Sequence, residues 1–216
     1  EDIDQFLLVI NKARKYCEEG KIVTFGVVPT SPEIGYGYIN ASVPFENILK
    51  AYPIKKFIEK PNLETAEQLI KDKKNFWNSG IFMAKSSTLI NEAKKYCKDL
   101  ATICKDSLDA SLIDLDFQRI NKEKFKNCPN ISIDKAIMEK TKIGMVIPFV
   151  AGWSDIGSWK TLWEVSKKDK NGNVLSGNIV NQFTYNCLIK SDKKLVVGIG
   201  IKDLIVVDTN DAVLIV

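Results

Sequence analysis

The spacing of apolar residues along the first 170 positions predicts alternating helices and strands. Apolar side chains recur at helical intervals over 2–19, and Gly20 follows where that helix would end. The next run, 22–28, is almost continuously apolar and rich in β-branched residues, which indicates a strand buried on both faces. Further strands are predicted at 54–59, 79–84 and 144–149, and further helices at 63–73, 87–100 and 133–140 and around Trp159 and Trp163. The pattern between 106 and 130 is weak and predicts no element.

Beyond residue 170 the helical spacing disappears. Asn171, Gly172 and Asn173 form a turn signal, and short apolar runs then alternate with polar turns. Over 195–216, 14 of 22 residues are aliphatic or alanine, which favours strands over loops. We therefore predict an α/β region over 1–170 and an all-β region over 171–216, built either as rungs of a β-helix or as a small sandwich. Because the chain starts at Glu1 and stops within an apolar run, we expect it to be part of a longer protein.

Composition excludes several classes of function. The net charge of +4 is too small to indicate a nucleic-acid-binding surface, and no apolar run reaches the ~18 residues of a membrane helix. The chain has no histidine, which excludes Ser-His and Cys-His nucleophile pairs and histidine-ligated zinc within it. Five cysteines without a C-x-x-C pair are typical of free thiols in the cytoplasm, where we expect the protein.

Two segments combine backbone freedom with polar side chains near predicted strand ends. Gly35 and Gly37 let backbone groups approach a ligand closely, although a plain glycine turn fits them as well. Glu59 and Lys60 precede Pro61, which cannot continue a central strand. If the strand ends there, the carboxylate can bind vicinal hydroxyls and the ammonium a phosphate; the alternative is an ordinary surface ion pair.

Two other segments carry single polar groups. Asn78 offers a donor and an acceptor suited to sugar hydroxyls, between Trp77 and Gly80; the alternative is a turn leading into a core strand. Asp155 lies in a glycine-bounded loop after a strand, where a carboxylate can hold Mg²⁺ together with substrate phosphates. The alternative for Asp155 is a helix N-cap, a role for which Ser158 is also placed.

In their order and spacing these segments resemble the sugar-phosphate nucleotidyltransferases, and most closely the bacterial mannose-1-phosphate guanylyltransferases. The resemblance covers nearly the whole chain and includes long forms fused to a phosphomannose isomerase domain. It implies a Rossmann-like (GT-A-like) mixed sheet with helices, incomplete in this chain, followed by a small β-helix-like tail. The matching stretches are FGVVPTSPEIGYGYI at 25–39, FIEKPN at 57–62, WNSGIF at 77–82, SIDKAIMEKT at 132–141, GWSDIGSW at 152–159 and GNVLSGN at 172–178.

The resemblance also implies a reaction, in which GTP and mannose 1-phosphate give GDP-mannose and diphosphate. Lys60 would bind the sugar phosphate, and Asp155 would be one of two aspartates that hold Mg²⁺; both would be catalytic. The sugar phosphate, with a second pKa of about 6, is already largely ionised at neutral pH, so no general base is required. The residues that would bind the sugar are Gly35, Gly37, Glu59 and Asn78.

The family's glycine-rich nucleotide loop, its second metal-binding Asp and the isomerase domain have no counterpart in this sequence. We therefore expect the chain to be inactive alone and to represent the sugar-phosphate side of the catalytic domain. The resemblance allows a homodimer through the β-rich tail and implies neither a nucleic-acid nor a membrane partner. The alternatives are a nucleotidyltransferase for another sugar or base, a non-catalytic subunit that binds sugar nucleotides, and a purely structural β scaffold.

Overall fold

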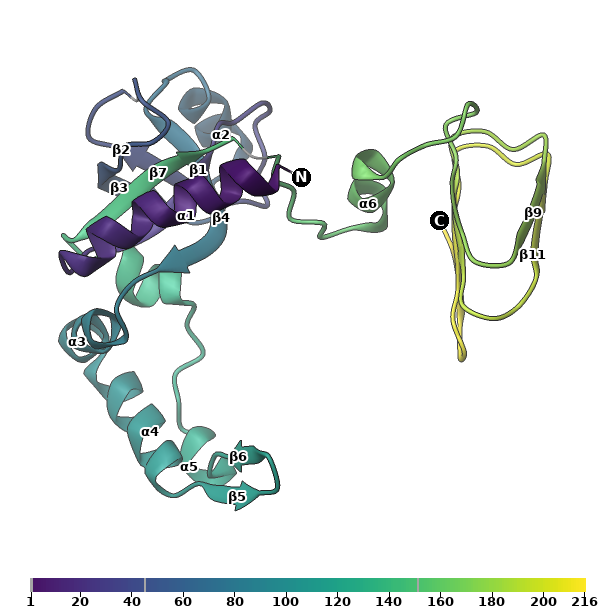
Figure 1. Ribbon diagram of the computed structural model, residues 1–216. Helices are drawn as coiled ribbons and strands as arrows, with labels where there is room; N and C mark the ends of the chain where they lie inside the picture. Colours follow the sequence, from purple (N-terminus) through teal and green to yellow (C-terminus); the bar gives the residue numbers. More distant parts are fainter. Residues whose placement is uncertain (1, 45, 151) are drawn as a thin grey trace. The chain divides into compact units, whose positions relative to one another are not determined.

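A computed structural model of the chain describes residues 2–44, 46–150 and 152–216, so position 151 of the loop predicted over 150–157 lies outside the described residues. The chain forms two compact units, Glu1–Trp153 and Ser154–Val216 (Figure 1). The boundary between the units, at 153/154, lies before the last helix of the chain. The boundary predicted from the hydrophobic pattern, near residue 170, lies after that helix. In the described residues, no helix has the length and apolar character needed to cross a membrane.

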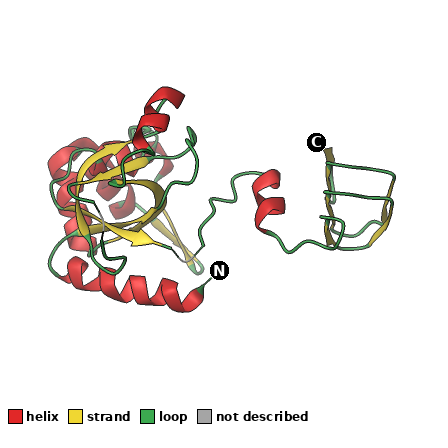
Figure 2. Cartoon of the chain, turned by 90° about the horizontal axis from the view of Figure 1, so that it is seen from above, coloured by secondary structure: helices red, strands yellow, loops and turns green. Residues whose placement is uncertain are grey.

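The first unit contains a mixed sheet whose strands form a closed ring (Figure 2). The order around the ring is β1-β4-β2-β3-β7, and β1 pairs with β7 in parallel while the other pairings are antiparallel. The sequence pattern did not predict this closure. The strands are β1 (Ile22–Val27), β2 (Tyr38–Ala41), β3 (Tyr52–Ile58), β4 (Asn75–Met83) and β7 (Gly144–Phe149).

Alternate residues of the central strands pack into two different apolar clusters, as the continuous apolar run predicts. On β1, Ile22 belongs to one cluster, while Val23 and Phe25 belong to the other. Helix α1 (Ile3–Glu18) covers the second cluster with Val9, Ala13 and Cys17, which are spaced four residues apart on one face. Both faces of the sheet are therefore covered, and Asp2 caps α1 by accepting from the Gln5 N–H at 3.0 Å.

The helices after β3 and β4 differ in part from the predicted ones. Helix α2 (Leu63–Leu69) ends four residues before the predicted end, and its predicted cap is confirmed, because Asn62 Oδ1 accepts from the Thr65 N–H at 2.9 Å. The single helix predicted over 87–100 is wrong. Two helices, α3 (Ser86–Tyr96) and α4 (Lys98–Asp109), meet at Cys97, whose φ of −148° and ψ of 60° interrupt the helical backbone.

The segment without a predicted element forms the far end of an arm that extends from the sheet of the first unit (Figure 1). A hairpin of β5 (Leu112–Asp114) and β6 (Phe117–Arg119) follows α4 and leads into α5 (Lys122–Phe125). The helix predicted over 133–140 is instead a single π-helical stretch, η1 (Asp134–Met138). Its residues Ala136, Ile137 and Met138 are buried in the first apolar cluster. Such π-helical turns occur often at functional sites.

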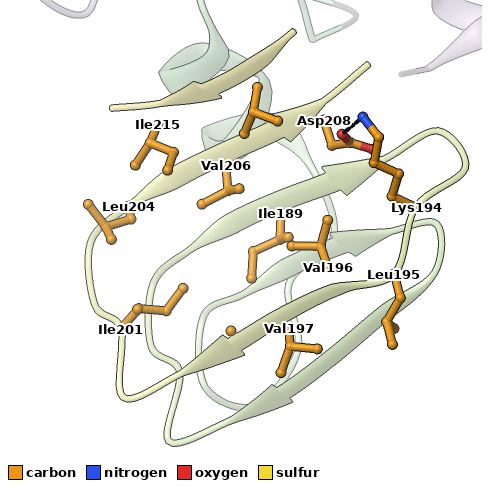
Figure 3. A pocket seen from close by; sticks show the side chains of 12 residues that line it. Ile189, Lys194, Leu195, Val196, Val197, Ile201, Leu204, Val206, Asp208 and Ile215 are labelled. Carbon is orange, nitrogen blue, oxygen red and sulfur yellow. Dashed lines mark hydrogen bonds and ion pairs between the residues drawn. The ribbon is translucent and has the colours of Figure 1, made fainter. Parts of the chain in front are cut away.

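The second unit begins with α6 (Trp159–Val165), and its strands form a β-helix, the first of the two predicted alternatives. The β8-β10-β12 strands are parallel neighbours, β9 pairs with β11 in parallel, and β13 closes against β12. Figure 3 shows the mostly apolar side chains that line a pocket of this unit, with the Lys194–Asp208 ion pair of 3.0 Å at one edge. The strands are β8 (Val174–Ser176), β9 (Ile179–Gln182), β10 (Leu188–Ser191), β11 (Val196–Ile199), β12 (Ile205–Asp208) and β13 (Val213–Ile215).

Candidate active site

The backbone of Gly37 lies directly against two of the other predicted site residues. The Asn78 N–H donates to the Gly37 carbonyl at 2.7 Å. A Cβ added to Gly37 would lie 2.7 Å from Glu59 Oε2 and 3.4 Å from Asn78 Cβ, so a side chain at this position would displace the Glu59 carboxylate. Gly35 is exposed, and a Cβ added there would meet no atom within 4 Å. Of the two glycines, Gly37 is therefore the one that packs against the other site residues.

The Glu59–Lys60 pair follows directly after β3, which ends at Ile58. Lys60 adopts a φ of +47°, a left-handed conformation that turns the chain before Pro61. The strand therefore ends before the pair, and Lys60 Nζ lies 4.0 Å from Glu59 Oε1. The Glu59 side chain is only 17% exposed, whereas Lys60 is 65% exposed, so the carboxylate faces inward and the ammonium lies at the surface.

We expected Asn78 to lie at the end of a strand. In the structure it lies within β4 instead. Between the paired positions Thr24–Phe82 and Gly26–Asn78, β4 contains two more residues than β1, and Gly80 has a φ of +74°. This irregularity is a bulge, and bulges re-aim side chains next to active sites. The polar side chain is thus placed by a distortion inside the sheet.

Three hydrogen bonds fix the Asn78 amide. Its Oδ1 accepts from the Thr24 hydroxyl at 3.1 Å and from the Gly80 N–H at 3.2 Å. Its Nδ2 donates to Asp134 Oδ1 at 3.2 Å, which assigns the amide orientation. Thr24 is fully buried on β1, so the amide is anchored to the core of the sheet.

Asp134, the first residue of η1, is a site residue that the sequence analysis did not identify. It lies in the SIDKAIMEKT stretch, among other polar residues of a predicted helix. Nothing in the sequence marked it as a residue that binds a ligand. Burial raises the pKa of the Glu59 carboxyl, and the negative charge of Asp134 raises that pKa further, while Lys60 and Lys135 lower it. Asp134 is therefore electrostatically coupled to Glu59 and hydrogen-bonded to Asn78.

The first unit thus brings four predicted residues, Gly37, Glu59, Lys60 and Asn78, to one place. The cluster provides one inward-facing carboxylate, an oriented amide and closely approachable backbone, with an ammonium at its rim. Carboxylates and amides bind neighbouring hydroxyl groups, and an ammonium binds a phosphate as a point charge. A hydroxyl-rich ligand that carries a phosphate matches this arrangement.

Asp155 belongs to the second unit, so its convergence with Lys60 stays a prediction. Ser158, rather than Asp155, caps α6, because Ser158 Oγ accepts from the Thr161 N–H at 3.1 Å. The Asp155 carboxylate folds over Gly157, where an added Cβ would lie 2.6 Å from Asp155 Oδ2. No cluster of three or more acidic or cysteine side chains suited to a metal ion occurs in the parts of the chain that the structure describes.

Comparison with known families accounts for both units. The family model described as nucleotidyl transferase matches residues 3–172, which is most of the chain. The chain belongs to the nucleotidyl transferase family. A second model, a mannose phosphate isomerase/GMP-like β-helix domain, matches residues 177–216 of this nucleotidyl transferase family member. The predicted α/β domain followed by a β-helix-like tail is therefore confirmed.

Curated relatives of this nucleotidyl transferase family chain bear one activity in their names. A protein of Salmonella montevideo named mannose-1-phosphate guanylyltransferase is 46% identical over 100% of this chain and 46% of its own length. The Escherichia coli K12 protein of that name is 43% identical over 99% of this chain and 45% of its own length. The resemblance inferred from the motifs is thus confirmed, and the chain spans about half the length of the curated relatives it matches.

Solved structures agree with the fold of this nucleotidyl transferase family chain. A Thermus thermophilus structure titled mannose-1-phosphate geranyltransferase superposes with a TM-score of 0.82 at 28% identity, covering 100% of this chain and 62% of the other. A Helicobacter pylori structure titled mannose-6-phosphate isomerase gives a TM-score of 0.65 at 26% identity, covering 72% of this chain and 60% of the other.

The close fit around Gly37 leads to a first prediction. In the intact protein, Gly37→Ala is expected to raise the KM for the sugar phosphate about tenfold or more, because the new methyl group displaces the Glu59 carboxylate. Gly35→Ala is expected to have the smaller effect, because its methyl group points into open space. Steady-state kinetics of both variants, with folding checked by circular dichroism, measure the difference. Equal effects at the two positions would contradict the role given to the Gly37 contact.

Proposed function

We propose that the protein containing this chain is a mannose-1-phosphate guanylyltransferase, which converts GTP and mannose 1-phosphate into GDP-mannose and diphosphate. The main support is structural: one cluster brings together Gly37, Glu59, Lys60 and Asn78. In addition, relatives that are 41–46% identical to this chain bear this name. The cluster suits a phosphorylated sugar, and the names of the relatives supply the guanylyl donor.

In this proposal each residue contributes binding and orientation. Glu59 accepts hydrogen bonds from sugar hydroxyls, the Asn78 amide holds another side of the ring, and the backbone at Gly35 and Gly37 lies against it. Lys60 binds the sugar phosphate and holds its oxygen for in-line attack on the α-phosphorus of GTP. Because that phosphate is already ionised near neutral pH, the chain requires no general base, which agrees with its lack of histidine.

A divalent metal ion, which we propose to be Mg²⁺, completes the proposed chemistry. The Asp155 carboxylate is a hard oxygen ligand, and Mg²⁺ in proteins is held by one or two carboxylates together with substrate phosphates. Asp155 is our candidate for one such ligand, because it is a carboxylate in the loop bounded by Gly152 and Gly157. When bound, the ion offsets negative charge on the α-phosphate and the leaving diphosphate.

We also propose that the enzyme is cytoplasmic, that it forms a homodimer through the β-helix, and that it has no nucleic-acid or membrane partner.

The activity is tested by incubating the intact protein with each of four nucleoside triphosphates and with mannose, glucose or N-acetylglucosamine 1-phosphate, and measuring diphosphate release. Preference for GTP with mannose 1-phosphate supports the proposal. Preference for another pair indicates a different nucleotidyltransferase. Binding of GDP-mannose without any turnover indicates a non-catalytic subunit.

The Asp134–Glu59 coupling gives a second prediction, about pH. Protonated Glu59 is the weaker acceptor for sugar hydroxyls, so mannose 1-phosphate binding is expected to weaken as the pH falls through the raised pKa of Glu59. Asp134→Asn removes a negative charge that raises this pKa, and the acid limb of the binding profile is therefore expected to move to lower pH. Titration calorimetry of both proteins over a pH series measures the shift.

The ligand also ionises over this pH range, but its ionisation affects both proteins equally. The difference between their pH profiles therefore reports on the protein. The surface variant Asp72→Asn serves as a control for the loss of one negative charge from the first unit. An acid limb that stays in place in Asp134→Asn, or that moves equally in the control, would contradict the coupling.

A further inference from the structure

Two cysteine thiols face each other on the arm of the first unit. Cys104 lies on α4 and Cys128 lies three residues after α5, and their Sγ atoms are 3.9 Å apart. Cys104 is exposed and Cys128 is half-buried, so small molecules reach the pair from solvent. A disulfide bond is about 2.05 Å long, so each sulfur needs to move by roughly 1 Å to form one.

The packing of α5 against α4 holds the two cysteines in these positions. The Asn121 N–H donates to the carbonyl of Ser107 at 2.9 Å, and Ser107 is fully buried on α4. Asn121 Oδ1 also caps α5 by accepting from the Lys124 N–H at 3.0 Å. The Cys128 N–H then donates to the Phe125 carbonyl at 2.9 Å, which ties the residue to the end of α5. Figure 1 shows α5 beside the end of α4.

We propose that Cys104 and Cys128 form a reversible intramolecular disulfide by exchange with small disulfides such as oxidised glutathione. The Cys104 thiolate attacks one sulfur of the small disulfide, which breaks that bond and releases one thiol as the leaving group. The Cys128 thiolate then attacks the Cys104 sulfur of the mixed disulfide and releases the second thiol. Two protein thiols become one disulfide, and the small disulfide is reduced to two thiols that take up the two protons.

Cys104 is the attacking thiol because it is the more exposed of the two. Burial by neighbouring groups raises the pKa of Cys104, and the adjacent Cys128 thiol raises it further. Since the thiolate is the nucleophile, the exchange is slow near neutral pH and becomes faster as the pH rises.

A third cysteine nearby provides a matched control. Cys97, at the break between α3 and α4, lines an apolar cavity of about 680 Å³ that Cys104 also lines. The close contact between sulfur atoms, at 3.9 Å, joins Cys104 to Cys128, whereas Cys97 makes the smallest contribution to the raised pKa of Cys104. The disulfide is therefore expected to be specific for one of two neighbouring partners.

Peptide mapping of the full chain tests this specificity. The chain is incubated with oxidised glutathione at mildly alkaline pH, quenched with acid, alkylated and digested with trypsin. The three cysteines fall in separate tryptic peptides, which are 96–98 for Cys97, 99–105 for Cys104 and 127–135 for Cys128. We expect the linked pair 99–105 and 127–135 to exceed every other linked pair by about tenfold, and to disappear after treatment with dithiothreitol.

Three variants complete the test. Cys104→Ser and Cys128→Ser should each abolish the linked pair, while Cys97→Ser should leave it unchanged. A lasting glutathione adduct on Cys104, a link to peptide 96–98 or a disulfide between two copies of the chain would each overturn the proposal. The wild-type map alone decides between these outcomes, so the test does not depend on how the variants fold.

Discussion

Replacement of Asp155 by asparagine in the intact protein is expected to lower turnover by about 10²-fold or more. The amide keeps the size of the side chain and removes the charged oxygen that we propose as a ligand for the divalent ion. A loss of this size corresponds to about 3 kcal/mol of transition-state stabilisation, within the range of a lost electrostatic contact to a transferring phosphoryl group. Initial rates over a magnesium titration measure the effect.

The asparagine variant also separates this role from a structural one. Asparagine caps helices as well as aspartate does, and Ser158 already caps α6, so the variant should fold normally. Asp192→Asn, at an exposed position in the β-helix, provides a control for the removal of one negative charge from the second unit. Turnover at the wild-type rate in Asp155→Asn would contradict the proposal that Asp155 is a ligand of the divalent ion.

Lys60→Ala is expected to reduce kcat/KM for mannose 1-phosphate by about 10²-fold while GTP binding stays unchanged. The ammonium is 65% exposed at the rim of the cluster, where it can meet the phosphate of an incoming ligand. Its removal leaves the sugar-binding groups in place but takes away the charge that holds the attacking phosphate. Kinetics with mannose 1-phosphate and separate calorimetry with GTP measure the two effects.

Lys56→Ala, an exposed lysine within β3, serves as the matched control. Both variants lose one positive charge from the same strand region, so a general electrostatic effect would appear in both. Equal loss of GTP and sugar-phosphate binding in Lys60→Ala would contradict the division of roles between the two substrates.

The sequence predicted those parts of the fold that depend on local pattern. The predicted first helix and the continuous apolar run of β1 appear in the structure as expected, because each reflects burial on one or two faces. The buried face of the helix differs in part, since Ile3 and Leu7, which the spacing predicted on it, are exposed and Val9 is buried. The predicted end of the strand before Pro61 is also confirmed, because proline removes a hydrogen-bond donor that a central strand requires.

Features that depend on pairing between distant segments could not be predicted in the same way. The ring closes through β1 and β7, and the bulge opposite Thr24 depends on the register of β4 against β1. Asp134 joins the site through the π-helical turn of η1, which has no signal in the spacing of apolar residues. A single sequence shows which residue types are available for a site, but the register of the strands decides which of them meet.

The parallel pairing of β1 with β7 also constrains how the protein is synthesised. β1 ends at Val27, whereas its partner begins at Gly144. A ribosome that adds 5–20 residues per second takes on the order of 10 s to cover that interval. During this time one edge of β1, a strand that is almost wholly buried in the folded chain, has no partner, and unpaired edges of this kind promote aggregation. A chaperone that shields nascent strands should therefore raise the yield of folded protein.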